Sequence, residues 1–227
     1  MDSYDISSLI TWTYTDFYQG AVAYDRDNSK LYVFFKTYDA DTDTTESKVA
    51  VFSVATDGSL TYETMYDVTY NGNLFYPWSG TYKDGYIYLL SNQAVVWGIR
   101  THIYKWDIST AQAIDRVFIH WKAGEAFGIT TDGMYIYVLD YDKNLRIYDS
   151  ELNLVDSIES TAIEVSDLRG FIARWDINSL VFAITTSSTT LKIGTFRTEA
   201  DVIVKSGTIS VDNLPYSTSP NHGTVTV

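Results

Sequence analysis

The 227-residue sequence predicts an all-β fold made of about four repeated units, each of four antiparallel strands. Two observations support this prediction. Aromatic residues are abundant, with 19 Tyr, 10 Phe and 6 Trp, and aromatic side chains favour strands over helices. A glycine followed by a short apolar strand with an aromatic centre also recurs four times along the chain. A hydrophobic content of 45% is sufficient to fill the core of a large domain of this class.

The repeat is recognised by its aromatic strand, which is centred in turn on Tyr32, Tyr88, Tyr137 and Phe182. A glycine precedes each of these strands, namely Gly20, Gly80, Gly128 and Gly170. Turn-forming residues such as Lys83-Asp84-Gly85 lie between the glycine and the aromatic strand, and Asp, Asn and Gly tolerate the backbone of tight hairpins. Each unit is therefore expected to begin with a glycine-bearing strand that pairs with the aromatic strand.

Two further alternating strands follow each aromatic strand, for example 48–52 and 60–68 in the first unit. Four such units predict a β-propeller of about four four-stranded antiparallel blades, because repeated four-stranded sheets pack radially around an axis. The expected blades cover approximately residues 17–70, 71–121, 122–160 and 161–210. Residues 8–15 are expected to add a closing strand to the last blade. Residues 211–227 are expected to form a C-terminal tail or arm. The sequence leaves open whether it is an extra edge strand, a linker, or an arm through which the chain would form a homo-oligomer.

The third unit has the most detailed pattern. Its sequence over residues 127–140 is Phe-Gly-Ile-Thr-Thr-Asp-Gly-Met-Tyr-Ile-Tyr-Val-Leu-Asp, and Asn-Leu-Arg-Ile-Tyr-Asp follows over 144–149. This stretch, within residues 125–150, resembles the NHL and YVTN classes of propeller repeat. The resemblance implies the propeller architecture, but it does not imply a particular function, because propellers serve many unrelated functions.

The charge of the chain narrows the classes of partner. With 29 acidic and 16 basic residues the formal net charge is −13, and such a field repels the phosphate backbone of nucleic acids. We therefore expect no nucleic-acid partner. No apolar run approaches the length of a membrane span, so no membrane insertion is expected. The absence of Cys excludes disulfides and thiolate metal sites.

An acidic loop follows the aromatic strand of the first unit. Its carboxylates, at alternate positions with one more a few residues on, are Asp39, Asp41, Asp43 and Glu46. Calcium binds six to eight oxygen ligands with flexible geometry, so this pattern makes the loop a candidate Ca²⁺ site. Thr44 stands where an EF-hand-like loop has glycine. The alternative interpretation is a solvated acidic hairpin tip, and the sequence leaves both open.

Antiparallel order places the second-to-third and fourth-to-first loops of all units on one face. Aromatic residues in or near these loops are the candidate ligand-binding residues: Tyr76, Trp78, Trp97, Trp121 and Tyr141. Exposed aromatic clusters typically form partner surfaces or platforms for sugar stacking. The alternative is that these rings fill the cores of their own blades.

No catalytic motif is present, and no residue is assigned a catalytic role. Carboxylates that a hydrolytic propeller would use are Glu125, Asp140, Asp142, Glu164 and Asp167. The sequence favours a non-enzymatic binding or adhesion module for a protein or glycan ligand, in an extracellular or virion-associated setting. A carbohydrate-active or other hydrolytic enzyme and a structural assembly subunit are the alternatives.

Overall fold

The computed structural model describes residues 14–39, 43–95, 98–120, 128–140, 144–159, 169–176, 179–187, 190–199 and 202–203, and side chains between residues 20 and 157. The chain divides into two compact units, residues 1–123 and 124–227. The described part of the chain contains no helix long and apolar enough to cross a membrane. The proposed tail, residues 211–227, lies outside the described residues.

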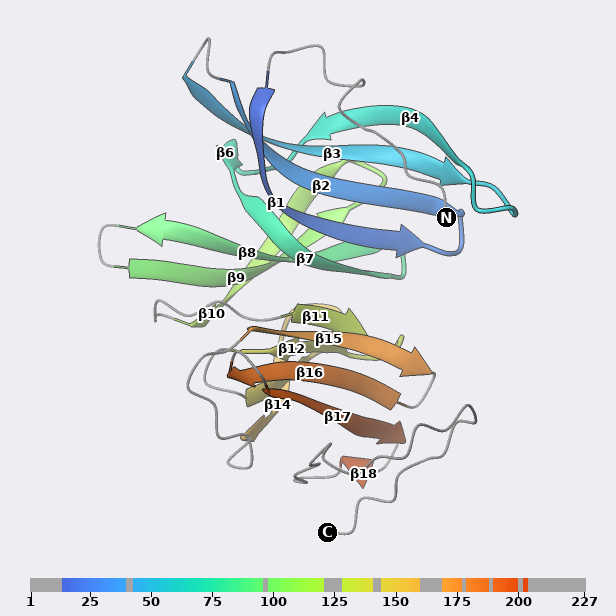
Figure 1. Cartoon of the computed structure of the whole chain (residues 1–227), viewed down its shortest axis with the longest axis vertical. Helices are drawn as coiled ribbons and strands as arrows, with labels where there is room; N and C mark the ends of the chain where they lie inside the picture. Colours follow the sequence, from blue (N-terminus) through green and yellow to red (C-terminus); the bar gives the residue numbers. More distant parts are fainter. Residues whose placement is uncertain are drawn as a thin grey trace. The chain divides into compact units, whose positions relative to one another are not determined.

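The first unit contains two four-stranded antiparallel sheets (Figure 1). The first sheet has the order β1 (Tyr14–Asp25), β2 (Lys30–Asp39), β3 (Thr44–Val54) and β4 (Leu60–Asp67). The second sheet follows the chain in the same way, with β7 (Tyr76–Lys83), β8 (Tyr86–Val95), β9 (Gly98–Asp107) and β10 (Gln112–His120). A short hairpin of β5 (Thr69–Tyr70) and β6 (Asn73–Leu74) connects the two sheets.

The second unit also contains two four-stranded antiparallel sheets. One consists of β11 (Gly128–Thr131), β12 (Ile136–Leu139), β13 (Asn144–Tyr148) and β14 (Leu154–Glu159). The other consists of β15 (Arg169–Asp176), β16 (Ser179–Ser187), β17 (Thr190–Glu199) and β18 (Val202–Ile203). Four antiparallel four-stranded sheets, with the glycine on the first strand and the aromatic residue on the second, confirm that part of the sequence prediction.

The expected closing strand is described only at its end. Tyr14 is the first residue of β1 and pairs with Asp39 of β2, within the first sheet. Residues 8–13 lie outside the described residues.

The core of the first unit is the apolar layer between its two sheets. Alternate residues of β2, Tyr32 and Phe34, face this layer from the first sheet, and Ile87 and Leu89 of β8 belong to the same buried cluster. Trp106 of β9 is fully buried among them and meets the rings of Tyr32 and Phe34 edge to face, with centroids 5.9 and 5.7 Å apart. Such aromatic pairs add to the free energy gained by burying apolar area.

Two inner-strand glycines lie close against the second strand of their own sheet. A Cβ added to Gly20 of β1 would lie 3.0 Å from the carbonyl oxygen of Phe34 in β2. A Cβ added to Gly80 of β7 would lie 3.0 Å from Cδ2 of Leu89 in β8, whereas the Cβ of Ala21 in the facing sheet, at 3.6 Å, would be at ordinary contact distance. Both glycines therefore leave room for the paired strand of their own sheet.

Aspartates organise the turns. The fully buried Asp25 accepts hydrogen bonds from the backbone N–H groups of Asp27 and Asn28, at 3.0 and 3.1 Å, and from the Asn28 amide. The left-handed residue of this turn is Ser29, with φ of 51°. In the second sheet Asp84 and Gly85 have φ of 50° and 83°, as the turn residues of the sequence led us to expect.

Replacing Trp106 tests whether the layer between the two sheets is the main core of the first unit. We expect Trp106→Ala to lower the free energy of unfolding by about 3–5 kcal/mol, because a large buried ring would leave a cavity. Ile114→Ala, at a position of the same sheet that is 49% exposed, is the control and should change it by less than about 0.5 kcal/mol. Urea denaturation measures both. Equal effects of the two variants would contradict this assignment of the core.

Candidate functional site

The connection between the first two sheets folds back as the β5–β6 hairpin. Asn71 and Gly72 form its turn with φ of 50° and 75°, which is the positive-φ geometry that Asn-Gly adopts readily in two-residue hairpins. β5 lies against β10. Between the hairpin and the second sheet is a cavity of about 200 Å³, lined by Tyr70, Asn71, Asn73, Leu74, Tyr104 and Arg116. We call it the hairpin pocket.

The base of the hairpin pocket is a group of packed aromatic rings. Phe75 stacks on Tyr104, with ring centroids 3.9 Å apart and planes 8° from parallel. Tyr70 meets Tyr104 edge to face at 5.7 Å. Phe75 and Tyr104 are buried, so these contacts fix the hairpin against β9 and give the pocket a rigid floor.

Arg116 of β10 supplies the positive charge of the pocket. Its guanidinium carbon lies 5.0 Å from the centroid of the Tyr70 ring, a distance at which a cation is attracted to an aromatic face. Burial raises the pKa of Tyr104 above its ordinary value, and Arg116 acts against that rise through a hydrogen bond and its charge. The Tyr104 hydroxyl therefore stays protonated at neutral pH.

His102 lies beside this group on β9. Its ring is 5.8 Å from that of Tyr104 and 5.6 Å from that of Phe118, measured between centroids. It is 6% exposed, and its Nδ1 atom has no hydrogen-bond partner in the structure. Burial, assisted by the charges of Arg116 and Arg100, lowers the pKa of His102 to about 4. The ring is therefore neutral at physiological pH, and the charge of the pocket comes from arginine.

Two of the five predicted ligand-binding residues have described side chains. Tyr76 and Trp78 begin β7 and are half-buried. The Ser91 hydroxyl accepts a hydrogen bond from the Tyr76 N–H and donates one to its carbonyl, both at 3.1 Å. The Lys36 ammonium lies 4.8 Å from the Tyr76 ring centroid. Trp97, Trp121 and Tyr141 lie outside the described residues.

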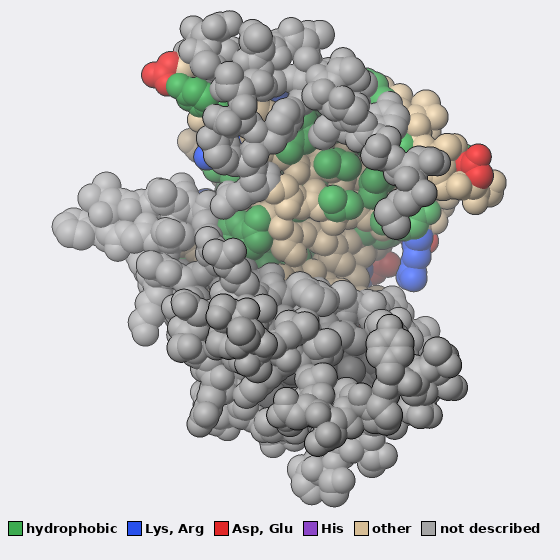
Figure 2. All heavy atoms as spheres, in the orientation of Figure 1, with side chains coloured by type: hydrophobic (Ala, Val, Ile, Leu, Met, Phe, Trp, Pro, Cys, Tyr) green, Lys and Arg blue, Asp and Glu red, His purple; other side chains and the backbone are tan. Residues whose placement is uncertain are grey.

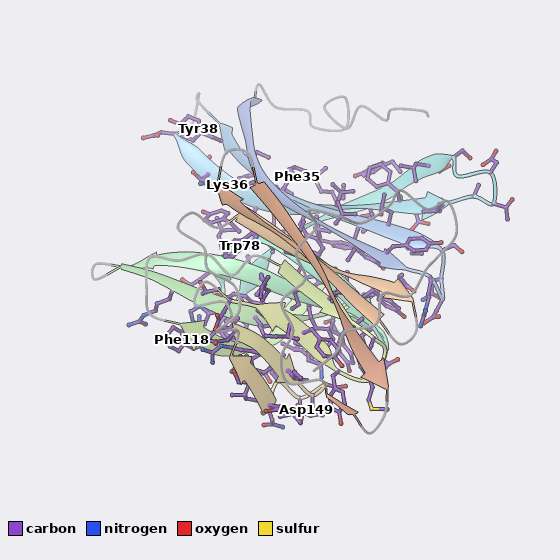
Figure 3. All side chains as sticks on the ribbon, turned by 60° about the horizontal axis from the view of Figure 1, so that its bottom comes forward. Phe35, Lys36, Tyr38, Trp78, Phe118 and Asp149 are labelled. Carbon is purple, nitrogen blue, oxygen red and sulfur yellow. The ribbon has the colours of Figure 1, made fainter. Side chains whose placement is uncertain are left out.

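The predicted loop face can be followed in Figure 3, where Lys36, Trp78 and Phe118 are labelled. They lie near the end of β2, the start of β7 and the end of β10. In antiparallel sheets the end of the second strand, the end of the fourth strand and the start of the first strand all lie at the same edge. The second-to-third and fourth-to-first connections leave the sheets at this edge. The β5–β6 hairpin is one of those connections, so the hairpin pocket and the residues Tyr76 and Trp78 belong to the same end of the first unit.

The acidic loop is described in part. The Asp43 carboxylate accepts a hydrogen bond from the Tyr38 hydroxyl at 2.7 Å, and the Glu46 carboxylate forms an ion pair with Lys48 at 3.0 Å. Asp41 and the side chain of Asp39 lie outside the described residues. In the described part of the chain, no group of three or more His, Asp or Glu side chains is arranged to hold a metal ion. The calcium site stays a prediction.

Among the carboxylates considered for hydrolysis, only Asp140 is described. It is 1% exposed and accepts hydrogen bonds from the Asn144 N–H at 2.8 Å and from Arg146 Nε at 2.6 Å. These contacts hold the turn between β12 and β13, which is a structural role. Glu125, Asp142, Glu164 and Asp167 lie outside the described residues.

Sequence reasoning missed most of the hairpin pocket. Tyr70, Asn71, Asn73, Tyr104 and Arg116 were not among the predicted site residues. The Asn71-Gly72 pair was a usable signal, because it is typical of a two-residue hairpin turn. Nothing local indicated that this hairpin would lie against Tyr104 and Arg116, more than thirty residues later in the chain.

Comparison with known proteins does not identify the chain. No protein-family model matches it, and no curated protein matches it. It is similar to a chain in a solved structure described as "Complex of KlAtg21 with coiled-coil of AgAtg16", with 11% sequence identity and a TM-score of 0.46. The match covers 78% of this chain and 52% of that one, so this chain spans about half the length of that neighbour. A likeness this weak identifies neither a ligand nor a partner.

The buried His102 makes stability depend on pH. The unfolded chain takes up a proton near the ordinary pKa of 6.5, whereas the folded His102 does so only near 4. The contribution of His102 to the free energy of unfolding is therefore fully present above pH 6.5. It is lost as the pH falls from 6.5 to 4, and the full loss is roughly 3 kcal/mol.

Urea denaturation at pH 7.5 and pH 4.5 measures this loss. His102→Phe keeps a ring against Tyr104 and Phe118 and removes the titration, so its loss between the two pH values should be smaller than that of the parent by about 2 kcal/mol or more. Equal losses in the parent and the variant would exclude His102 as the cause.

Proposed function

We propose that this chain is a non-enzymatic binding module on a four-bladed β-propeller scaffold. Its ligand, a protein or a glycan, would meet the end of the first unit where the β5–β6 hairpin lies. The observation that carries the proposal is the hairpin pocket, a preformed cavity with a rigid aromatic floor and an exposed arginine. A concave site with a few converging polar groups is where a ligand is expected to bind.

The propeller arrangement is supported by the way neighbouring sheets meet inside each unit. β1 lies against β7, and β11 lies against β15, so the first strands of successive sheets are neighbours, as blades around an axis require. Within their own units, the second strands β8 and β12 carry buried residues on both faces. The resemblance of residues 125–150 to NHL and YVTN repeats supports the same arrangement.

The first sheet allows a test of whether the four sheets form a closed ring. Its face away from the second sheet is apolar and includes a cluster of Phe35, Ala50 and Phe52. On the same face Val22 and Tyr24 of β1 are 56% and 47% exposed. Hydrophobic side chains are visible over the first unit in Figure 2. Soluble proteins rarely leave such a face open, and in a closed ring the next blade would cover it.

Placing a charge at Val22 distinguishes a covered face from a solvent-exposed one by its effect on the free energy of unfolding. If the ring closes, Val22→Glu buries an unpaired carboxylate and should lower the free energy of unfolding by more than about 2 kcal/mol. Ile114→Glu, at a comparably exposed position on β10, should change it by less than about 0.5 kcal/mol. Denaturation is measured on material shown to be monomeric by sedimentation. Two equally mild effects would mean that the face is open to solvent, and ring closure would be rejected.

The binding function is tested by one change at the mouth of the pocket. Leu74 lines the cavity and is 42% exposed, so Leu74→Asp adds a charge at little cost to folding. We expect this variant to lose at least about tenfold in affinity for ligands that the parent captures on a glycan array or from a panel of purified proteins. Met134→Asp, at another exposed apolar position in the turn between β11 and β12, should bind like the parent.

Two results would contradict the binding module. One is an equal response of the Leu74→Asp and Met134→Asp variants, which would remove the hairpin pocket from the binding surface. The other is turnover of an array glycan by the parent protein, which would make the chain a carbohydrate-active enzyme.

A further inference from the structure

The hairpin pocket has a chemistry more specific than that of a general partner surface. Arg116 is exposed, and no carboxylate among the described residues forms an ion pair with it. Its contacts in the pocket are with the Tyr70 ring and the Tyr104 side chain. A guanidinium held over an aromatic ring keeps a defined orientation while its remaining N–H donors stay available for a planar anion.

The other lining groups suit a ring with hydroxyl groups. The amide of Asn73 donates from Nδ2 to the Asn71 carbonyl at 3.1 Å, so its Oδ1 remains an acceptor. Asn71 and Asn73 are both exposed at the hairpin tip, and Leu74 provides an apolar wall. Amide side chains bind hydroxyl groups as donor and acceptor at once, whereas apolar walls contact the C–H faces of a sugar ring.

Size and charge restrict the ligand further. A cavity of about 200 Å³ is smaller than the usual site for a drug-sized molecule, so it holds one ring or one side chain. The chain has a net charge of −13, and this field opposes a dianion such as a phosphate monoester more strongly than a monoanion. One arginine forms a bidentate pair with one carboxylate.

We propose that the hairpin pocket recognises a carboxylate-bearing monosaccharide unit of a glycan, with Arg116 paired to the carboxylate. Tyr70 and Leu74 would contact the sugar ring, and Asn71 and Asn73 would bind its hydroxyl groups. This inference rests on the proposed binding function and adds the class of ligand to it.

The probes are methyl β-D-glucuronide and its neutral counterpart, methyl β-D-glucoside, which differ only at the carboxylate. Binding to the full chain is measured by isothermal titration or by saturation-transfer NMR. We expect the glucuronide to bind at least tenfold more tightly than the glucoside. We also expect its affinity to fall as the salt concentration rises, because an exposed ion pair is screened.

Arg116→Gln should reduce glucuronide affinity to the level of the glucoside and leave glucoside affinity unchanged. The matched control is Lys105→Gln on the neighbouring strand. The Lys105 ammonium also lies over tyrosine rings, 4.3 Å from the Tyr86 centroid and 5.9 Å from that of Tyr88, but Lys105 does not line the pocket. The Lys105→Gln variant should bind the glucuronide with the affinity of the parent protein. Circular dichroism and the unfolding midpoint show that both variants fold.

Three outcomes would overturn the inference. The first is equal affinity for the two sugars. The second is an equal effect of the Arg116 and Lys105 substitutions. The third is tighter, Arg116-dependent binding of a triglutamate peptide, which would make the carboxylate that of a protein. In each case the proposed binding function would still stand if Leu74→Asp, but not Met134→Asp, weakened the binding of another ligand. If Leu74→Asp weakened the binding of no ligand, both the ligand class and the binding function would be rejected.

Discussion

The burial of Trp106 between the first two sheets is the contact on which the rest of the site depends. Its ring meets Tyr32 and Phe34 of the facing sheet edge to face, and this fixes β9 relative to β2. Tyr104 is two residues away on the same strand, so its side chain lies on the same face. Tyr104 belongs to the same buried cluster as Trp106, and it provides the surface on which Phe75 stacks and against which Tyr70 of the β5–β6 hairpin packs. The pocket is thus an extension of the core layer.

The negative charge of the chain has a partly structural origin. Asp25, Asp107, Asp132, Asp140 and Asp149 each accept hydrogen bonds from backbone N–H groups or side chains in a turn. Such turns recur in a fold made of consecutive hairpins, and aspartate satisfies turn N–H groups well. The acidic composition, from which we expect no nucleic-acid partner, therefore also reflects how many tight turns the fold requires. Against this background an exposed arginine in a cavity is a notable local exception.

The sheet architecture could be predicted from the sequence because it is encoded locally. Alternation of apolar residues, the recurring glycine and the Asp-Gly turns each concern a few neighbouring residues, and they gave the four antiparallel four-stranded sheets. The pocket could not be predicted in the same way. It depends on the pairing of β9 with β10, on the stack of Phe75 with Tyr104, and on the position of Arg116 over Tyr70. These contacts join residues that are distant in sequence, and no local pattern specifies them. The sequence identified Tyr76 and Trp78 as aromatic residues near the loops, but it did not show that their side chains are half-buried.

A crystal structure of the chain with methyl β-D-glucuronide is the most direct test of the central claim that the hairpin pocket is a ligand site. The account predicts a sugar in the cavity, with its carboxylate about 3 Å from the Arg116 guanidinium nitrogens and its ring against Tyr70 and Leu74. An ordered sugar elsewhere on the chain, with the cavity holding only solvent, would contradict it.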